Sequence, residues 1–550
     1  MAAGGAVQSR EVQARPLPEL VRAMLRPEFY PDPAARVELR QTHISYVFIA
    51  GDFVYKLKKP VRFAFLDCAD LSRRYQLCCE EVRLNRRLAP DVYLGVYPIL
   101  RGAAGLMLGE EARGPVPDAV EYAVKMVRLP EERMLDGLIR AGRADAKTIR
   151  AVAARIFDFH KQCSSQLGWT YGSAAAIWRL VVGNLTECDR FIGNTIESRQ
   201  YIALEQYLGG FIAAHWEAIN DRVRAHRVVE GHGDLRCEHI FVSDGGIKMI
   251  DCVEFSERLR YGDVASDLAF FAMDLDRLGA RELADEAVDS YVAASGDDGL
   301  IEFVPFYKCY RAVVRAKVAT LKSLEDEVEP GERDRARTAA RNYFGLAYGY
   351  AASAAPATIV VCGKSATGKS TVARMLRYRT GFAVINSDRV RKRLAGIPAD
   401  VHVHSAYDTG IYTEGFTQRT YETMIHEAEA MLREGRGVIL DGTFKDPINR
   451  RSVMEAAARV GVPILFIECR ADRNEIMRRL SERSKRLGEV SDADVEVFLQ
   501  QEADFVPLTE IPARNYLVVD TAGGPGRVVL DAHEALKQFF ESRRAVSGAV

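Results

Sequence analysis

The chain has 550 residues, of which 48% are hydrophobic and 27% charged, so its composition is that of an ordinary globular protein and argues against wholesale disorder. Its 75 Lys and Arg residues balance 76 Asp and Glu residues, and the net charge of -1 excludes a whole-molecule field that would attract nucleic acid or an anionic membrane. Because a single hydrophobic core stops growing at about 250–300 residues, we expect two or three domains.

The cysteines and the first residues indicate a compartment. The ten cysteines are scattered without a Cys-x-x-Cys pair, and the adjacent Cys78 and Cys79 cannot easily bridge, so they do not predict a disulfide framework. The first twenty residues lack the basic start and the apolar stretch of a secretory signal. We therefore expect a cytoplasmic protein with no membrane partner.

The first part of the chain is expected to form a strand-rich lobe followed by a helical lobe. Extended patterns occur around residues 37–57 and 121–129, a helix is predicted through residues 79–88, and mostly helices follow. Lys56 lies near the end of the first extended region. A lysine there, paired with Glu81 on the helix, would hold the α- and β-phosphates of a nucleotide. Lys58 and Lys59 compete for this role; strand alternation places Lys56 and Lys58 on one side, and the Val-x-Lys pattern favours Lys56.

The sharpest feature of this first part is the segment HGDLRCEH at residues 232–239, which a short strand and Asp251 follow. Kinase chemistry needs one acid that accepts the substrate proton and another that holds Mg²⁺ on the phosphates. Asp234, on a tight loop, and Asp251, at a strand end, are the candidates for these two roles.

Over about residues 35–345 these motifs resemble the aminoglycoside/choline phosphotransferase family, a branch of the protein-kinase-like fold. The resemblance implies phosphate contacts by Lys56 and Glu81, a catalytic base at Asp234, a metal ligand at Asp251 and a structural acid at Asp267. Two features depart from the family. His239 stands where the family has a metal-binding Asn, and residues 42–52 replace a glycine-rich lid. An imidazole at position 239 can still be a metal ligand, although Mg²⁺ prefers oxygen.

A boundary is expected near the small, uncharged stretch at residues 351–357, which Pro356 interrupts. We predict a kinase-like domain over residues 1–345, a linker over 346–356 and a second domain over 357–550. Short β-branched runs at residues 358–362, 382–385, 437–440, 463–468 and 516–519 alternate with helical patterns in that domain. This alternation predicts a parallel sheet with helices on both faces, so the whole chain combines an α+β and an α/β module.

The strongest motif in the chain opens this second domain. Residues 363–370, GKSATGKS, match G-x-x-x-x-G-K-[ST] in full, with a predicted strand before and a helix after. The backbone of such a loop cradles phosphates, Lys369 would reach the β- and γ-phosphates, and Ser370 would hold Mg²⁺. The expected ATP-binding residues are Gly363, Lys364, Ser365, Ala366, Thr367, Gly368, Lys369, Ser370 and Thr371.

Further candidates follow later strands of the same predicted sheet. Asp388 and Arg391 come after the second strand, at the sheet edge where ligands bind, so Asp388 is a candidate base and Arg391 would hold the acceptor or a phosphate. Asp441 ends the third strand, from which an acid reaches Mg²⁺. Arg479 and Arg483 could close over the triphosphate as a lid; the alternative is a solvated basic face paired with Glu475 and Glu482.

Residues 357–545 resemble the small P-loop kinases, a group that includes gluconate kinase, chloramphenicol phosphotransferase, zeta toxins and a polynucleotide kinase. The resemblance rests on GKSATGKST, NSDRVR, LDGTFKDPINRR and RRLSER. It implies Asp388 as general base with Arg391 beside it, and Arg483 as a catalytic lid arginine.

The leading hypothesis is therefore a bifunctional enzyme that uses ATP and Mg²⁺ and transfers the γ-phosphate to a hydroxyl of a small molecule or of a nucleic-acid end. Nucleic acid is the less favoured partner, because a basic run such as Arg389 to Arg393 is more often a solvated face. In the alternative, which His239 motivates, the first module is a pseudokinase or sensor whose ligand regulates the second.

Overall fold

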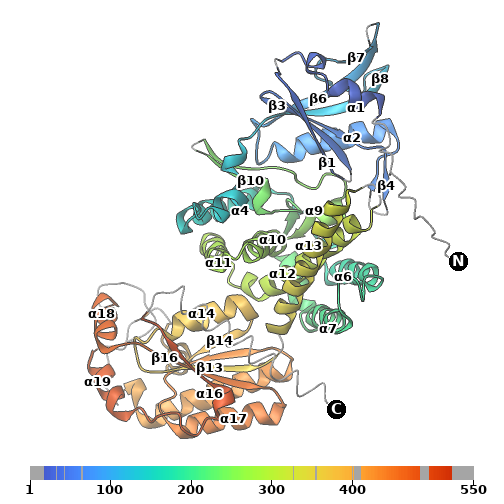
Figure 1. Cartoon of the computed structure of the whole chain (residues 1–550). Helices are drawn as coiled ribbons and strands as arrows, with labels where there is room; N and C mark the ends of the chain where they lie inside the picture. Colours follow the sequence, from blue (N-terminus) through green and yellow to red (C-terminus); the bar gives the residue numbers. More distant parts are fainter. Residues whose placement is uncertain are drawn as a thin grey trace, which may run out of the picture. The chain divides into compact units, whose positions relative to one another are not determined.

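The computed structural model describes residues 18–522 except 33, 43, 64–65, 104, 244, 326–327, 354–355, 399–400, 402–409 and 484–494. The chain divides into two compact units (Figure 1). Unit 1 is Met1–Leu138, His232–Asp234 and Glu238–Arg260, and unit 2 is Ile139–Gly231, Leu235–Cys237 and Tyr261–Val550. The domain limits expected from the sequence, 1–345, 346–356 and 357–550, stay a prediction.

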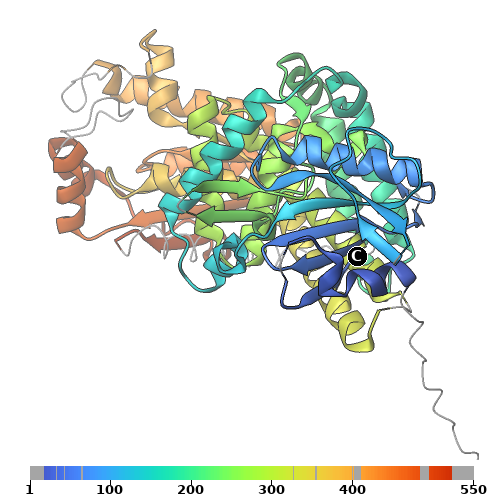
Figure 2. The same cartoon turned by 90° about the horizontal axis from the view of Figure 1, so that it is seen from above.

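Unit 1 is built on a six-stranded antiparallel sheet with the strand order β1-β2-β3-β8-β6-β7 (Figure 1 and Figure 2). The strands are β1 (Val37–Gln41), β2 (Ser45–Ala50), β3 (Phe53–Lys58), β6 (Tyr93–Gly102), β7 (Gly105–Leu108) and β8 (Ala119–Val127). Gly51, at φ 59°, makes the tight turn between β2 and β3. The predicted strand-rich lobe is confirmed.

Alternation along β3 divides its side chains between two small cores. Tyr55 and Leu57 pack with α1 (Glu19–Met24), whereas Val54 packs on the side of α2 (Leu71–Asn85). α2 begins and ends earlier than the helix predicted through residues 79–88. Its start is set by the Asp70 carboxylate, which caps the helix by accepting from the N–H groups of Ser72 and Arg73. Lys56 and Lys58 share a face of β3 with Val54. Both lysines therefore lie opposite α2.

The remaining elements of unit 1 include a hairpin that brings two loop segments side by side. They are β4 (Arg62–Phe63), β5 (Leu66–Asp67), η1 (Pro27–Phe29), η2 (Glu131–Arg133), α9 (Glu257–Arg260) and the hairpin of β10 (Ile240–Ser243) with β11 (Gly246–Met249). At the open end of this hairpin the Ile250 N–H donates to the carbonyl of His239 at 3.0 Å. The residues just before β10 and just after β11 therefore lie side by side.

The first part of unit 2 is helical. It contains α4 (Ala146–Gln162), α5 (Gly168–Gly172), α6 (Ala174–Asp189), α7 (Ser198–Ala214), α8 (Trp216–Arg224), α10 (Val264–Arg277), α11 (Arg281–Ser295), α12 (Leu300–Ser323) and α13 (Pro330–Ser353), with β9 (Val228–Glu230) paired to β12 (Tyr261–Asp263). Every residue of α10 from Val264 to Leu275 is buried, so this helix is the core of the region. Among the described residues, no helix is both long and apolar enough to cross a membrane.

The last part of unit 2 is a five-stranded parallel sheet with the order β14-β15-β13-β16-β17. Its strands are β13 (Thr358–Cys362), β14 (Ala383–Asn386), β15 (Val438–Asp441), β16 (Ile464–Arg470) and β17 (Tyr516–Asp520). Ile359 and Val361 pack against α14 (Lys369–Thr380), and Val360 and Cys362 pack against the side of α16 (Glu414–Arg433) and α17 (Pro447–Val460). The predicted parallel sheet with helices on both faces is confirmed (Figure 1).

Candidate active sites

The loop after β13 has the backbone form that a phosphate-binding loop needs. Gly363 (φ 129°), Ala366 (φ 60°) and Gly368 (φ 84°) all have positive φ, and α14 begins directly after the loop at Lys369. A Cβ atom at Gly363 would lie 2.5 Å from the carbonyl oxygen of Cys469, so only glycine fits there. Such a loop turns successive N–H groups inward beside the positive end of the helix dipole, an arrangement suited to an anion.

Polar side chains meet where this loop and the carboxyl end of β15 adjoin. Asp441 is 2% exposed and accepts hydrogen bonds from the Ser370 hydroxyl and, at 2.8 Å, from the side-chain amide of Asn386. Burial raises the pKa of Asp441, and the Lys369 ammonium acts against that rise. Lys369 Nζ donates to the carbonyl of Lys364 at 2.7 Å. The oxygen donors of Ser370 and Asp441 fit a hard cation such as Mg²⁺.

The predicted base and its arginine lie together on α15 (Ser387–Leu394). Arg391 Nη1 donates to Asp388 Oδ1 at 3.0 Å, and its guanidinium carbon lies 4.7 Å from the centroid of the Tyr412 ring. Asn386, which caps α15, pairs in register with Asp441 across the parallel strands. The structure thus brings Asp388 and Arg391 to the same sheet edge as the phosphate loop.

The two predicted lid arginines belong to α18 (Arg473–Arg483). Arg479 donates to the backbone oxygen of Thr521 at 2.6 Å, to that of Ala366 at 3.3 Å and to Glu475 Oε1 at 2.7 Å. In this structure Arg479 therefore braces the phosphate loop against the segment after β17. The side chain of Arg483 lies outside the described residues, so its predicted lid role stays a prediction.

One contact to the phosphate loop has no counterpart in the predicted site. The Ser365 N–H donates to Oε1 of Gln501 at 2.8 Å. Gln501, 9% exposed, belongs to α19 (Val495–Asp504), whose Phe498 packs with Ile476 of α18 and with Ala366. No sequence signal marked Gln501, because its role depends on a contact across 136 residues.

In unit 1 the lysines of β3 and the predicted glutamate of α2 form a buried cluster. Lys56 Nζ lies 2.9 Å from Glu81 Oε1 and 2.6 Å from Asp251 Oδ1. Lys58, beside it on the same face, lies 2.6 Å from Glu81 Oε2 and also pairs with Glu254. Burial opposes the charged form of Lys56, yet Asp251 and Glu81 hold its pKa well above the usual value. Burial likewise opposes ionisation of Glu81, but Lys56 and Lys58 keep its pKa low.

The two predicted acids, Asp234 and Asp251, lie next to this cluster. The Asp234 N–H donates to His232 Nδ1 at 3.3 Å, and His239 Nδ1 lies 2.9 Å from the carbonyl oxygen of Asp234. His239 Nε2 lies 3.7 Å from Asp251 Oδ2. One of the three candidate lysines, Lys56, therefore contacts Glu81 and Asp251 together, and Asp234, His239 and Asp251 are neighbours.

Side chains that the sequence did not single out hold Asp251 in place. Asp251 has φ 67°, which is unusual for a residue other than glycine, and its N–H donates to the Tyr93 hydroxyl at 3.2 Å. Asn85, buried in α2, accepts from the N–H of Cys252 at 2.9 Å. Strained backbone held by several contacts is typical of functional sites.

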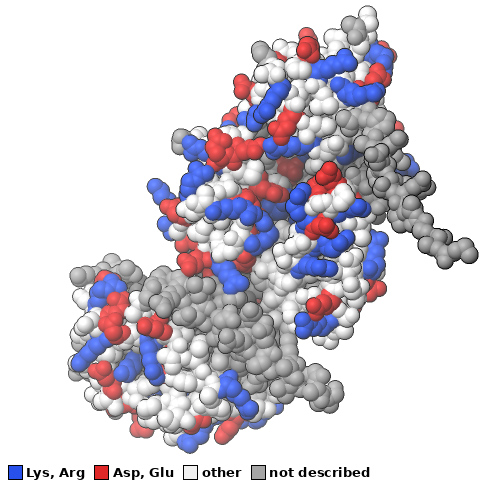
Figure 3. Space-filling view, viewed as in Figure 1, with Lys and Arg blue, Asp and Glu red and all other residues white. Residues whose placement is uncertain are grey.

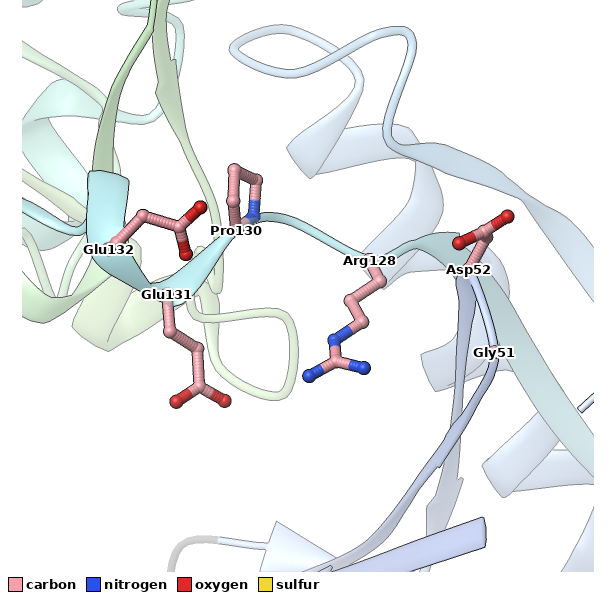
Figure 4. Close-up of a pocket in the computed structure, with 6 residues that line it drawn as sticks. All are labelled: Gly51, Asp52, Arg128, Pro130, Glu131 and Glu132. Carbon is pink, nitrogen blue, oxygen red and sulfur yellow. The ribbon is translucent and has the colours of Figure 1, made fainter. Parts of the chain in front are cut away.

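A separate pocket of about 530 Å³ lies elsewhere in unit 1 (Figure 4). It is lined by Gly51, Asp52, Arg128, Pro130, Glu131 and Glu132. None of the predicted site residues lines it, so it plays no part in the assignment of the two sites.

The charged residues bear on the nucleic-acid alternative. On the face that Figure 3 shows, the described Lys and Arg residues are interspersed with Asp and Glu. A continuous basic stripe, which binding along a nucleic-acid backbone requires, is not present among the described residues of that face.

Comparison with known proteins gives three kinds of similarity. Residues 359–508 match the AAA domain family. A gluconokinase structure from Sinorhizobium meliloti 1021 is 20% identical with a TM-score of 0.26, covering 35% of this chain and 98% of that one. An aminopropanol kinase structure is 14% identical with a TM-score of 0.37, covering 60% and 96%. A choline/ethanolamine kinase family protein from Mesorhizobium loti is 13% identical with a TM-score of 0.35, covering 60% and 98%.

Two uncharacterised proteins, Rv2004c of Mycobacterium tuberculosis and Mb2027c of Mycobacterium bovis, are each 30% identical to this chain over 462 residues. The alignment covers 84% of this chain and 88% of each relative. The chain therefore belongs to the same family as these mycobacterial proteins.

Proposed function

We propose that the chain is a bifunctional, ATP-dependent phosphotransferase with one site in the residues of unit 1 and one in the P-loop region of unit 2. Each site transfers the γ-phosphate of ATP to a hydroxyl of a small molecule. The observation that carries the proposal is the meeting of Lys369, Ser370, Asp441 and Asp388 around a loop of positive-φ residues. The match of residues 359–508 to the AAA domain family supports it.

In the P-loop site each residue has a definable task. Lys369 moves from the carbonyl of Lys364 to the β- and γ-phosphates, and the inward N–H groups bind their oxygens. Asp388, oriented by Arg391, accepts the proton of the acceptor hydroxyl. Ser370 and Asp441 would hold a magnesium ion, which would neutralise charge on the phosphates. Positioning and electrostatics account for most of the rate in phosphoryl transfer.

In the unit 1 site Lys56, fixed by Glu81, binds the α- and β-phosphates, and Asp234 accepts the acceptor proton. Asp251 and His239 are the metal ligands of this proposal. The distance of 3.7 Å between His239 Nε2 and Asp251 Oδ2 is compatible with one divalent ion between them.

The test uses the intact chain and calorimetric titration with MgATP. Lys369→Ala should remove one of two nucleotide sites and the activity that belongs to it. Lys147→Ala, at an exposed position on α4, is the control and should leave nucleotide binding unchanged. Equal loss in both variants, or full binding in Lys369→Ala, would contradict the assignment.

A second candidate function is favoured by one observation. His239 occupies the position where the kinases that unit 1 resembles have a metal-binding Asn. In this second candidate function, unit 1 binds its ligand without turnover and regulates the P-loop site. Turnover of ATP by the Lys369→Ala chain, abolished by adding Asp234→Asn, excludes the sensor alternative; binding without turnover favours it.

A further inference from the structure

His239 has a defined orientation in unit 1. The residue is 8% exposed, and Nδ1 lies 2.9 Å from the carbonyl oxygen of Asp234. A carbonyl oxygen only accepts hydrogen bonds, so Nδ1 carries a proton and Nε2 is the nitrogen that holds the lone pair in the neutral ring. Nε2 faces carboxylates: Asp251 Oδ2 is 3.7 Å away and Glu238 Oε1 is 3.9 Å away.

Asp251 is oriented to meet it. Lys56 takes Oδ1 of Asp251 at 2.6 Å, and the Tyr93 hydroxyl accepts from the Asp251 N–H at 3.2 Å, so Oδ2 is the oxygen directed toward His239. Two ligands about 2.1 Å from one ion, at a right angle, lie about 3.0 Å apart. A shift of less than about 1 Å would therefore let Nε2 and Oδ2 bind the same ion.

The donor types decide which ion fits. Among the described residues, no group of three or more His, Cys, Asp or Glu side chains is arranged to hold a metal. Phosphate oxygens of a bound nucleotide are further ligands that such an ion can take. Imidazole suits transition ions such as Fe²⁺, Ni²⁺ and Zn²⁺, whereas Mg²⁺ prefers oxygen ligands in a strict octahedron. In the P-loop site the protein donors, Ser370 and Asp441, are oxygens only.

We propose that the unit 1 site takes its nucleotide with a divalent transition ion that accepts an imidazole ligand, held by His239 Nε2 and Asp251 Oδ2, while the P-loop site uses Mg²⁺. Mn²⁺ serves as the paramagnetic probe of this ion. This inference rests on the proposed function, because it requires that unit 1 binds a nucleotide. The two sites of one chain then differ in cation requirement as a direct result of one nitrogen ligand.

The test uses the intact chain with Lys369→Ala, so that the P-loop site is silent, loaded with Mn²⁺ and a non-hydrolysable ATP analogue. Pulsed electron paramagnetic resonance on protein with ¹⁴N- or ¹⁵N-labelled histidine reports directly bound imidazole without any substitution in the site. We expect a histidine nitrogen coupling that changes with the isotope and disappears in His239→Asn. His426→Asn, at an exposed position on α16, is the control and should keep the coupling.

A second measurement compares nucleotide affinity with Mn²⁺ and with Mg²⁺. The nucleotide affinity with Mn²⁺ divided by that with Mg²⁺ should exceed one. This ratio should fall by at least about 10-fold in His239→Asn, since even outer-shell changes at metal sites lower metal affinity by that factor. Bound Mn²⁺-nucleotide without histidine coupling, or an unchanged ratio, would overturn this inference alone. No nucleotide binding by the Lys369→Ala chain with either cation would instead remove the proposed function of unit 1 and this inference with it.

Discussion

At the scale of single residues, Asp388 carries the chemistry that we assign to the P-loop site. The hydrogen bond of 3.0 Å from Arg391 fixes its direction, and Arg391 is itself 7% exposed. Asp388→Asn should lower kcat by about 10²–10⁴-fold, the range for loss of a general base, while ATP affinity changes little. Kinetics with a small-molecule hydroxyl acceptor that the chain phosphorylates measure this change in kcat. Glu434→Gln, at an exposed position after α16, should leave kcat unchanged; an active Asp388→Asn protein would assign the base elsewhere.

A second residue, Asp289 of α11, gives a pH-dependent prediction. Burial raises the pKa of Asp289 to about 6, above the value of an exposed aspartate. A carboxyl group with a raised folded-state pKa favours folding when it is protonated, so its contribution is lost as pH rises from about 4 through about 6. Asp289→Asn should therefore stabilise the protein at pH 7.5, by about 1–2 kcal/mol after allowance for its partial exposure, and much less at pH 4.

Urea unfolding at the two pH values measures this difference. Glu282→Gln, at an exposed position on the same helix, is the control and should show no such pH dependence. A variant of Asp289 that is destabilised at pH 7.5 would show that the ionised carboxylate makes a favourable contact.

At the scale of elements, the conformation of the phosphate loop requires a residue without a side chain at position 363. Gly363 has φ 129° and its added Cβ would lie 2.5 Å from a backbone oxygen of β16. Gly363→Ala should abolish nucleotide binding at the P-loop site, because the loop must move to relieve the contact. Gly435, at φ 79° with no atom within 4 Å of an added Cβ, is the matched control. Gly435→Ala should cost only about 1–2 kcal/mol of backbone strain and keep binding. Equal binding in both variants would show that the loop tolerates a side chain at position 363.

The helical region of unit 2 is held by a buried ion-pair cluster on α8. Arg222 Nη2 donates to Asp263 Oδ1 at 2.8 Å and to Asp297 Oδ2 at 3.1 Å, and its side chain is 8% exposed. Arg222→Ala leaves two buried carboxylates without this partner and should cost about 3–5 kcal/mol.

Arg224, two residues along the same helix, provides the control. Its side chain is 54% exposed and pairs with Asp221 and Glu217 at the surface. Arg224→Ala should cost no more than about 1 kcal/mol. Thermal unfolding of both variants compares the two, and a similar loss of stability would argue against the buried cluster.

The elements themselves were largely predictable from the sequence. The parallel sheet follows from short β-branched runs between helical patterns, and the phosphate loop from a complete local motif. Strand alternation correctly placed Lys56 and Lys58 on one face. The contacts of Glu254, Asn85 and Gln501 were not predictable, because each joins parts of the chain that are distant in sequence and no local pattern records such pairs.

At the scale of the whole molecule, we propose that one chain carries two separate nucleotide sites. Each has its own lysine, Lys56 or Lys369, and its own acids, and each set of residues lies within a single compact unit.

The most direct test is calorimetric titration of the intact chain with a non-hydrolysable ATP analogue, with Mg²⁺ and Mn²⁺ both present. We predict two nucleotides bound per chain, one in Lys369→Ala, one in Asp251→Asn and none in the double variant. A wild-type chain that binds a single nucleotide, or a double variant that still binds one, would contradict the account.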